Sequence, residues 1–465
     1  MKLVIAAVDA VIRVLSKPGA GGTLAAVPSG SAGAVAVVLA FALLPIDIRA
    51  TDDWPHWRGP DRDSSTTADS GWDGGFWKGD QGPPVLWRAE LGAGCGSVLV
   101  VDDLIYGLGW SEGSDRLICL DLNEGRVRWL QRYDAPRYGR HATGDQGFYE
   151  GPSSTPAHDP TTGWLYTLGT DGELRAWNGR AGGAPQWRLN LYDEFDVPRR
   201  PQVTERPNTL RDYGYTTAPL VWQDWLLVEV GCPQLGTVAA LDKASGEVLW
   251  WSELKDQAGH SGGLVPLKVD GVPCVAVLTL TGIAVIRLDG GSAGRTVGRI
   301  EWRSHFGNNI ATPTAVGQDL LVTTKWNQRT SRLRASLDRG LEEIWTSDRS
   351  SNVCSAVVHD GFVYWAHRGL YCQDWETGEL KWSGGRFSDA SSIVVTGDGR
   401  LILWSNDGDL ALVEGAGRSP DAYRELAWAG GVSDNMAWPH VVVVEGRILA
   451  KDRGGRLTCL KIGQR

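Results

Sequence analysis

The sequence is poor in several features that mark common classes of protein. Among 465 residues it has only 2 Met and 7 Phe, and after residue 50 it shows little of the apolar periodicity that indicates amphipathic helices. It contains no HExxH pair, no P-loop and no EF-hand loop, which argues against the enzymes and calcium sensors built on these motifs. Lys and Arg are scattered and the net charge is −9, so the chain offers no basic footprint for nucleic acid.

Cysteine is present, but without the patterns that carry chemistry. No two cysteines are adjacent, and no two are spaced as a metal-binding pair. Three of them fall at one position of a repeated unit, which favours small buried residues in strands. An odd number leaves at least one thiol unpaired in an exported protein. The seven are Cys95, Cys119, Cys232, Cys274, Cys354, Cys372 and Cys459.

Glycine and tryptophan are abundant, with 60 Gly and 23 Trp, and they follow a repeat. Residues 370–382 read LYCQDWETGELKW: a strand, a tight turn at Thr377-Gly378, and a second strand that ends in Trp. Residues 117–129 (LICLDLNEGRVRW), 174–187 (LRAWNGRAGGAPQW) and 238–250 (VAALDKASGEVLW) repeat this pattern. We expect the glycines to serve turns, and each Trp to wedge between packed sheets where its N–H finds a partner.

Taking the terminal Trp as a marker gives the period of the repeat. The spacings are 42, 58, 63, 52, 43, 37 and 46 residues, in the range of propeller blades. Each unit carries three further alternating runs before its Trp strand. The markers are Trp87, Trp129, Trp187, Trp250, Trp302, Trp345, Trp382 and Trp428.

The two ends of the repeat are complementary. The last unit, residues 441–462, lacks a Trp strand, and the first Trp strand, residues 85–91, lacks a unit. Pairing the two would close a ring and remove exposed sheet edges, whereas a linear solenoid would need polar caps that we do not see. The sequence therefore predicts an all-β fold: an eight-bladed β-propeller of four-stranded antiparallel blades over residues 85–465, closed by the N-terminal strand.

The first 84 residues differ from the repeat. Residues 1–50 hold Lys2, Arg13 and Lys17, an apolar run at 34–44 and a small-residue cut after Ala50, which predicts an export signal. The run is too short for a comfortable membrane span. The segment is either cleaved, which we favour and which would leave no span, or kept as an uncleaved anchor. Residues 51–84 are predicted to be a latch and an irregular connection. Their WPHWRGP segment (54–60) either lays its Trp side chains on the propeller surface, which we favour, or lines a ligand mouth.

Two insertions, residues 132–152 and 192–215, are rich in Tyr and mixed charge and would lie where the central channel opens. The residues before each first strand are small or polar, and eightfold geometry would bring them to the same opening. They serve tight turns, which we favour, or a polar ligand site, and this ring is where a candidate site would lie. Its residues are Tyr149, Tyr215, Thr216, Thr217, His260, Asn309, Thr312, Asn352, Asp389, Asn435 and Trp438.

One enzyme motif is present in the sequence without the structural context that it requires. Residues 259–263, GHSGG, fit G-x-S-x-G, but a nucleophile elbow needs a strand before the serine and a helix after it. Here a polar turn precedes and an apolar strand follows. A hydrolase is therefore the weakest of the hypotheses that we keep.

The repeat, L-x-A-L-D-x-x-T-G-x-x-x-W in its best copies at 238–250 and 370–382, resembles the pyrroloquinoline-quinone (PQQ) type propeller repeat. The WPHWRGP opening resembles exported PQQ-like proteins of planctomycete-type bacteria. The resemblance covers residues 54–462 and implies the fold. That family includes quinoprotein dehydrogenases and the outer-membrane-assembly lipoprotein BamB. The chain lacks the vicinal cysteine pair of the dehydrogenases, a recognisable calcium set, and the acylated cysteine of BamB.

From these observations we expect an exported, non-catalytic propeller, periplasmic or secreted, that serves as a binding scaffold in the cell envelope. Envelope proteins or a small polar ligand are the expected partners, nucleic acid is not, and we expect a monomer. No catalytic residue, metal ligand or cofactor is assigned from the residues. The alternative implied by the resemblance is a quinoprotein oxidoreductase that uses PQQ and calcium to act on an alcohol or sugar.

Overall fold

The structure is a computed structural model, and it describes residues 53–74, 82–136, 151–199, 213–327 and 329–462. Residues 50–465 form one compact unit. Its described part is almost entirely β, with the short α2 (Leu191–Phe195) and 3-10 turns η3 (Gly179–Ala181), η4 (Gly290–Ser292), η5 (His305–Gly307) and η6 (Lys325–Asn327). The predicted all-β class is confirmed.

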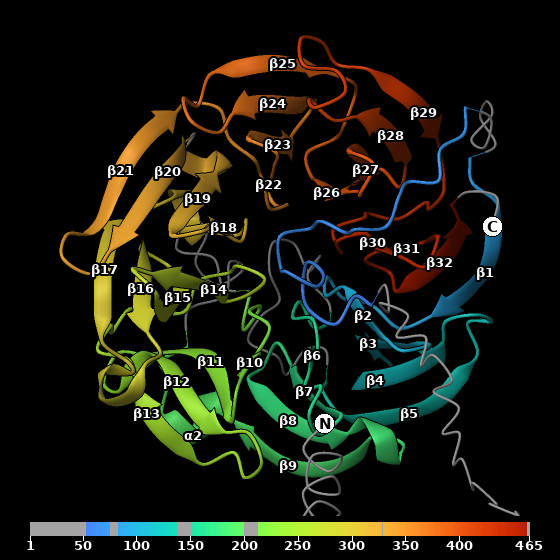
Figure 1. Ribbon diagram of the computed structural model, residues 1–465. Coiled ribbons are helices and arrows are strands. Elements are labelled where there is room, and N and C mark those ends of the chain that lie inside the picture. The colour runs from blue at the N-terminus through green and yellow to red at the C-terminus, as the bar shows by residue number, and fades with distance from the viewer. Residues whose placement is uncertain (1–52, 75–81, 137–150, 200–212, 328, 463–465) are drawn as a thin grey trace, which may run out of the picture. The chain divides into compact units, whose positions relative to one another are not determined.

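The strands pair antiparallel, mostly in groups of four (Figure 1). The first groups are β2 (Val98–Val101), β3 (Leu104–Ser111), β4 (Ser114–Asp121), β5 (Val127–Asp134); β6 (Ala157–His158), β7 (Trp164–Leu168), β8 (Glu173–Asn178), β9 (Ala184–Asn190); β10 (Leu220–Trp222), β11 (Trp225–Cys232), β12 (Gly236–Asp242), β13 (Val248–Trp251); and β14 (Val265–Val269), β15 (Val272–Leu278), β16 (Gly282–Arg287), β17 (Thr296–Glu301).

The later groups follow the same order. They are β18 (Thr314–Val316), β19 (Asp319–Thr324), β20 (Arg329–Ser336), β21 (Gly340–Ser347); β22 (Val357–His359), β23 (Phe362–Ala366), β24 (Leu370–Asp374), β25 (Leu380–Gly384); β26 (Ser391–Val395), β27 (Arg400–Ser405), β28 (Leu410–Glu414), β29 (Glu425–Ala429); and β30 (Val442–Val444), β31 (Arg447–Lys451), β32 (Arg456–Lys461) with β1 (Val85–Glu90).

Two joins between strands bear on the architecture. β1 pairs with β32 from Val85↔Leu460 to Glu90↔Arg456, so the first described strand shares a sheet with the last. The groups β22–β25 and β26–β29 are linked into one eight-stranded sheet by the single pair Ala366↔Ser391. Among the described residues, the strands outside this eight-stranded sheet form six four-stranded sheets, one of which contains β1 and β32.

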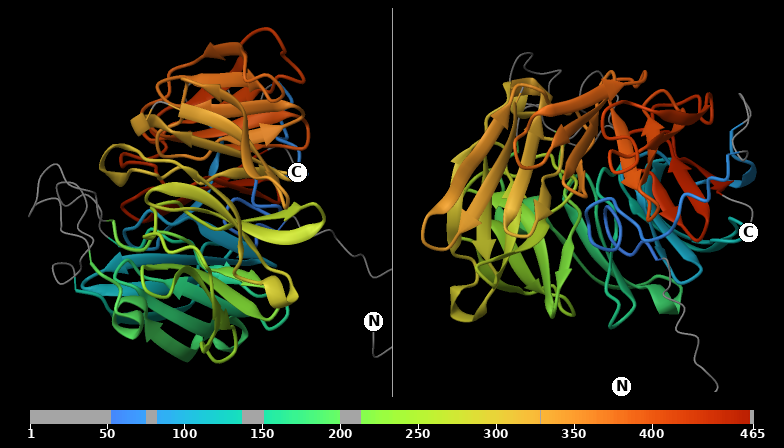
Figure 2. Two further views of the ribbon diagram at one scale, coloured as in Figure 1. Left: turned by 90° about the vertical axis from the view of Figure 1, so that its left-hand side faces the viewer. Right: turned by 45° about the horizontal axis from the view of Figure 1, so that its top comes forward.

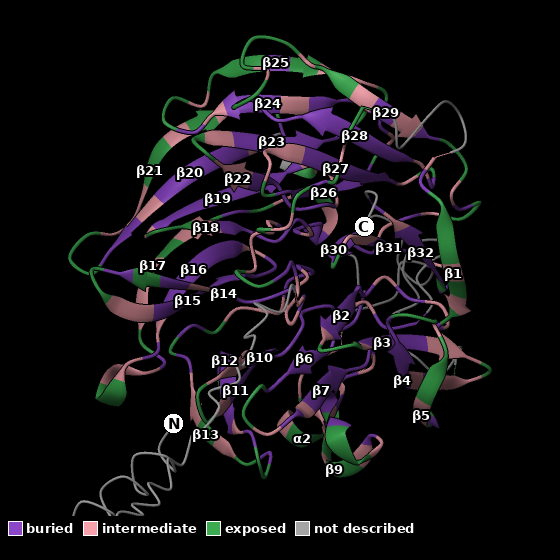
Figure 3. Cartoon of the chain, turned by 45° about the vertical axis from the view of Figure 1, so that its right-hand side comes forward, coloured by how far each residue is buried: buried purple, intermediate pink, exposed green. Residues whose placement is uncertain are grey.

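Within each group the first strand lies innermost and the last strand outermost (Figures 1 and 2). Buried residues fill the inner strands, and exposed stretches gather on the outer ones (Figure 3). The fully buried β26 and the largely exposed β1 illustrate the contrast. Apolar clusters are formed by residues of neighbouring sheets, such as Val285 and Leu320, so each sheet is stabilised by its neighbours.

The repeat motif can now be explained residue by residue. Its Asp accepts the backbone N–H groups two and three residues later, as Asp374 does from Glu376 and Thr377, both at 2.9 Å, which fixes the turn. Its Gly has a positive φ and leaves room for the Trp of the preceding sheet. A Cβ at Gly378 would lie 2.7 Å from the Trp345 ring. The turn of one sheet therefore packs against the tryptophan of the preceding sheet.

The tryptophan N–H groups partly follow the expectation. Nε1 of Trp87, Trp187 and Trp345 donates to the backbone oxygens of Leu122, Lys243 and Trp375, respectively, each in the following sheet, at 2.9–3.1 Å. Nε1 of Trp250 and of Trp382 is buried and has no hydrogen-bond partner among the described residues. A Trp side chain that packs between sheets therefore does not always form the expected hydrogen bond.

Two of the markers read from the sequence are not equivalent to the others. In most sheets the marker Trp pairs with the residue just before a β-bulge in the neighbouring strand, as Trp129 pairs with Cys119. In β17 that place belongs to Gly298, and in β29 it belongs to Ala427. Trp302 lies beyond its strand, where its Nε1 donates to Thr324 Oγ1 at 2.8 Å. With no side chain at Gly298, β17 packs directly on β21.

The segment that precedes the sheets crosses between inner strands (Figure 1). Trp54 pairs with Val100 of β2 through two backbone hydrogen bonds of 2.9 Å, and Thr66 N donates to Val395 O of β26 at 2.9 Å. Between them, the fully buried Arg58 donates to Thr314 Oγ1 and to the oxygens of Pro313 and Ala356. One short segment thus binds strands that lie far apart in the sequence.

Candidate functional site

A pocket lies where the loops before several inner strands meet. Its empty volume is about 610 Å³, part of which is open solvent. The lining combines aromatic rings, small hydroxyls and two aliphatic side chains. We call it the inner pocket, lined by Trp57, Cys95, Ser153, Tyr213, Thr216, His260, Gly262, Ile310, Thr312, Val353, Ser355, Trp438 and His440.

Some residues of the predicted ring line this pocket: Thr216, His260, Thr312 and Trp438. Thr216 Oγ1 donates to Ser261 O at 3.0 Å, and Thr312 Oγ1 accepts from Gly262 N at 2.8 Å. The His260 ring contacts Tyr213 edge-on, with 4.7 Å between the ring centroids. Residues that come before different inner strands are therefore brought together.

Other predicted residues support the fold. Tyr215 Oη donates to Val230 O at 2.9 Å, and Thr217 Oγ1 donates to Glu229 and to Ser261 O. The Asn309 amide nitrogen donates to three backbone oxygens, those of Thr279, Leu280 and Trp302. These contacts tie loops together beside the pocket, outside its lining.

The remaining predicted residues also lie outside the lining. Asp389 is exposed and binds Arg368 at 3.0 Å, while Asn435 is exposed and its Oδ1 accepts from Met436 N. Asn352 has a buried Oδ1 that finds no hydrogen-bond partner in the described part of the chain. Tyr149 lies outside the described residues.

The prediction missed much of the wall. Ser153 belongs to a polar run before an inner strand, and WPHWRGP was considered as a ligand mouth, so both gave a signal in the sequence. Cys95 and Ser355 gave none, because only their tertiary neighbours distinguish them from other small residues. Tyr213 and His440 stand beside predicted positions and reach the pocket through their rings.

Trp57 both holds the N-terminal segment in place and lines the pocket. Its ring lies 4.4 Å from that of His440 and against the backbone of residues 262 and 263. A Cβ at Gly262 would lie 2.6 Å from the Trp57 ring, and one at Gly263 would lie 2.7 Å from it. The two interpretations of WPHWRGP are therefore compatible.

The GHSGG motif acquires a packing role from the same contacts. Its last two glycines seat Trp57, and the strand β14 follows it instead of a helix. Ser261 Oγ is buried and has no hydrogen-bond partner among the described residues. A nucleophile needs a base within hydrogen-bond reach, so this geometry does not fit a hydrolase.

Among the described residues, the wall of the inner pocket carries no Asp, Glu, Lys or Arg. Burial, together with the charge of Arg58, lowers the pKa of His440 to about 3, so the ring is neutral at neutral pH. Burial raises the pKa of the Cys95 thiol, which keeps it protonated. At neutral pH His440 therefore carries no charge, and Cys95 is a thiol and not a thiolate.

Charged groups stand directly behind the wall. Lys451 is buried and donates to Gly94 O at 2.7 Å and to Gly96 O at 2.9 Å, the two residues that flank Cys95. Burial lowers the pKa of Lys451 to about 8. On another side, the buried carboxylate of Glu229 accepts from Gly259 N at 2.9 Å and from Thr217. Charges of both signs thus stand behind a lining that, in its described part, has no Asp, Glu, Lys or Arg.

These residues do not fit the cofactors that the resemblance implies. Calcium is held by oxygen ligands that usually include carboxylates, and the described residues of the wall offer no carboxylate. Within the part of the chain that the structure describes, no group of three or more His, Cys, Asp or Glu could hold a metal ion. PQQ carries carboxylates of its own, and the described residues of the wall include no Lys or Arg to pair with them.

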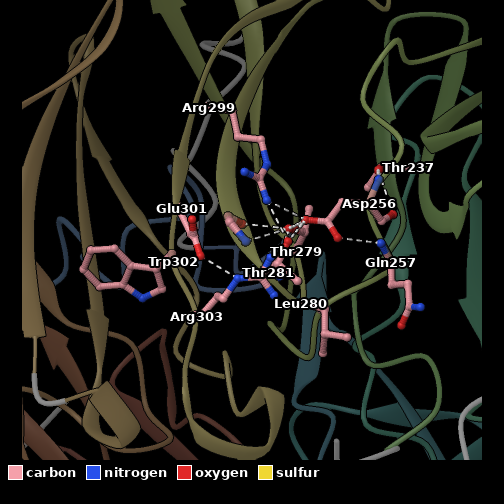
Figure 4. Close-up of polar contacts among 12 residues, drawn as sticks. Thr237, Asp256, Gln257, Thr279, Leu280, Thr281, Arg299, Glu301, Trp302 and Arg303 are labelled. Carbon is pink, nitrogen blue, oxygen red and sulfur yellow. Dashed lines mark hydrogen bonds and ion pairs between the residues drawn. The ribbon is translucent and has the colours of Figure 1, made fainter.

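A second polar cluster, around Asp256, is structural (Figure 4). Its Oδ2 accepts from Thr279 Oγ1 at 2.6 Å, from Thr281 Oγ1 and from Arg299 at 3.1 Å, while Gln257 N donates to Oδ1. Although burial raises the pKa of Asp256, these hydrogen bonds outweigh it and hold the pKa below its usual value. A carboxylate with all these donors already bound ties loops together.

Comparison with known proteins identifies the fold. No protein-family model matches the sequence, and no curated protein is significantly similar to it. Among solved structures, BamB from Moraxella catarrhalis is 14% identical, with a TM-score of 0.56 over 82% of this chain and 99% of that one. The quinohemoprotein alcohol dehydrogenase of Comamonas testosteroni is 13% identical, with a TM-score of 0.60 over 89% of this chain and 81% of that one.

The chain has a β-propeller fold similar to that of BamB and of the quinohemoprotein alcohol dehydrogenases. Quinohemoprotein alcohol dehydrogenase ADHIIG from Pseudomonas putida HK5 agrees, at 13% identity and a TM-score of 0.58 over 89% of this chain and 81% of that one. At such identities the likeness establishes the propeller fold alone. Among the described residues of the propeller, no helix is long and apolar enough to cross a membrane.

Proposed function

We propose that this chain is an exported, non-catalytic β-propeller whose inner pocket binds a ligand or a segment of a partner protein in the cell envelope. The observation that carries the proposal is the composition of the wall, which among the described residues joins aromatic rings and hydroxyls without a carboxylate, a Lys, an Arg or a metal set. Pockets of this kind bind and orient ligands. The described wall lacks the ligand set that metal-assisted chemistry needs.

The proposed architecture is a closed ring of eight four-stranded blades. It is supported by the pairing of β1 with β32 and by the single pair that links the groups β22–β25 and β26–β29. We further propose that residues 1–50 are an export segment removed after Ala50, that residues 51–84 are the latch, and that the mature protein is a periplasmic or secreted monomer of the planctomycete type. Mass spectrometry of the protein from fractionated cells tests the cleavage.

The alternative function is a PQQ- and calcium-dependent oxidoreductase acting on an alcohol or sugar, which the quinohemoprotein dehydrogenases of similar fold favour. Purified protein is mixed with PQQ and calcium, and its absorbance, melting temperature and dye reduction with ethanol or glucose are recorded. We expect no change in the cofactor spectrum, no rise in melting temperature and no dye reduction. A bound-cofactor spectrum with alcohol-dependent dye reduction would overturn the proposal.

A further inference from the structure

Three hydroxyl groups of the inner pocket can form further hydrogen bonds. Thr312 Oγ1 accepts from Gly262 N at 2.8 Å, which leaves its O–H free to donate. Thr216 Oγ1 donates to Ser261 O at 3.0 Å, which leaves its lone pairs free to accept. The Ser355 hydroxyl has no hydrogen bond among the described residues, so it can do both. A ligand must therefore offer donors and acceptors together, as alcohol hydroxyls do.

Flat and aliphatic surfaces complete the wall. Trp57 is held against residues 262 and 263, and Trp438 is partly exposed in the pocket. The partly exposed Ile310 and Val353 each stand two residues before a pocket hydroxyl, that of Thr312 or Ser355. Aromatic faces carry negative partial charge and attract C–H groups, and the aliphatic pair offers space for a methyl group.

The charges behind the wall disfavour an ionic ligand. Arg58 is bound to Pro313 O and Ala356 O, next to Thr312 and Ser355, and Lys451 stands behind Cys95. The acceptors of Arg58 and Lys451 among the described residues are backbone and hydroxyl oxygens. Glu229 stands behind Thr217, outside the lining. A cation would meet the charges of Arg58 and Lys451, and either a cation or an anion would lose hydration in a pocket whose described lining has no Asp, Glu, Lys or Arg to pair with it.

We propose that the inner pocket binds an uncharged sugar ring that carries an N-acetyl group. The C–H face of the ring lies on Trp57 and Trp438, its hydroxyls bind Thr216, Thr312 and Ser355, and the acetyl methyl group lies against Ile310 and Val353. A carboxylate would use only the pocket donors, and an ammonium group only the acceptors. This inference rests on the proposed function, because it names the class of ligand for the same pocket.

The test compares sugars that share one ring. N-acetylglucosamine, glucose and glucosamine differ only at carbon 2, and glucuronate has a carboxylate in place of the hydroxymethyl group of glucose. Each is titrated into the full protein by calorimetry at pH 7, with the melting temperature as a second readout. We expect N-acetylglucosamine to bind saturably, glucose more weakly, and the two charged sugars at least about tenfold more weakly than N-acetylglucosamine. N-acetylgalactosamine and a trimer of N-acetylglucosamine then show which ring is preferred and whether a glycan chain binds better than the free sugar.

Variants locate the binding. Ser355→Ala removes a hydroxyl that makes no hydrogen bond in the fold, so it should weaken N-acetylglucosamine binding severalfold and leave the melting temperature unchanged. Trp438→Ala should weaken binding about tenfold. Trp326→Ala, at an exposed Trp outside the pocket, is the control and should bind as the parent does.

Two results would overturn this inference. One is that neither N-acetylated sugar binds, or that glucosamine or glucuronate binds as well as they do. The other is sugar binding that survives both pocket variants. Neither result touches the proposed function, which fails instead if PQQ and calcium give a bound spectrum and dye reduction.

Discussion

At the scale of single residues, the N-terminal segment shows how few side chains hold distant parts of the chain together. Trp54 is 2% exposed and belongs to an apolar cluster with residues of three sheets, such as Val100, Val394 and Val443. Arg58 meets only neutral oxygen acceptors, each of which would otherwise be a buried, unpaired group. The segment is therefore part of the core.

Trp54→Ala should lower the free energy of unfolding by about 3–5 kcal/mol, because a large side chain leaves a cavity in a packed interior. Urea unfolding followed by far-UV circular dichroism measures the loss. Trp326→Ala is the matched control, since Trp326 is 39% exposed and should change stability by no more than about 0.5 kcal/mol. Equal, small losses in both variants would show that the segment is only loosely attached.

His440 makes stability depend on pH. Its pKa is about 3 in the folded protein and 6.5 in the reference state, so below pH 6.5 the unfolded chain binds a proton that the folded chain does not. Stability should therefore fall with acid, by about 2 kcal/mol between pH 7 and pH 5 from this residue alone. The loss continues until the pH reaches the folded pKa.

Urea unfolding of the parent and of His440→Leu at pH 7 and pH 5 isolates this contribution. The variant should lose about 2 kcal/mol less than the parent between the two pH values. His305→Leu, at an exposed position, should behave as the parent does. A parent and a His440→Leu variant with the same pH dependence would contradict the assignment.

At the scale of elements, the repeat is a device for joining sheets. The Asp of the turn fixes the backbone, the Gly admits a foreign tryptophan, and the Trp of the next strand docks on the following sheet. Gly298 and Ala427 replace that Trp in two sheets. At Gly298 the strand β21 packs closely on β17, so the two sheets stay in contact without the Trp side chain.

Two glycines of the β22–β25 group allow the contribution of the tryptophan contact to stability to be distinguished from that of the turn conformation. Gly378 has φ +74° and faces the Trp345 ring, whereas Gly361 has φ +78° and open space beyond its Cα. Gly361→Ala should cost about 1–2 kcal/mol, the strain of the left-handed conformation. Gly378→Ala should cost about 1–3 kcal/mol more, because its methyl group must also displace the ring.

The two variants are compared by urea unfolding under identical conditions. Trp345 can be removed in turn, since Gly378→Ala should lose its extra cost in a Trp345→Ala background. Equal losses of stability at the two glycines would mean that the contact between Gly378 and the Trp345 ring does not constrain the residue at this position.

At the scale of the whole molecule, β1 and β32 join the two ends of the described chain in one sheet. If this pairing closes a ring, as we propose, damage to that sheet should destabilise every other sheet through its neighbours. A chain of sheets without closure would lose only its end, since each repeat of an open array depends on adjacent repeats.

Leu460→Asp tests this coupling, because Leu460 is 1% exposed and pairs with Val85. We expect a loss of at least about 3 kcal/mol, from a buried carboxyl group, in one transition that coincides by fluorescence and circular dichroism. Leu86→Asp, on β1 but 45% exposed, is the control. Two separate transitions in the Leu460 variant would contradict a closed, cooperative ring.

The strands and turns could be predicted from the sequence because they depend on near neighbours. Alternation along 370–374, the turn at Thr377-Gly378 and the return at Leu380 are local, and they are found as β24, a turn and β25. The equivalence of Trp302 and Trp428 with the other markers was wrong. Register depends on where a β-bulge falls, and that is settled between two strands.

The inner pocket was predicted in outline and not in composition. The order of elements alone implied that the loops before the inner strands would meet, and Thr216, His260, Thr312 and Trp438 do so. Whether a polar residue lines the pocket or ties a loop depends on its contacts. Asn309 and Thr312 lie three residues apart and have different roles for that reason.

By itself the sequence determined the repeat, the all-β class and the turns, since alternation and turn chemistry act over a few residues. Tertiary structure alone decided that Trp57 meets Gly262 and His440, and that charges of both signs stand behind the described wall. Most of these contacts join residues hundreds of positions apart, and no local pattern of letters encodes the distance between them.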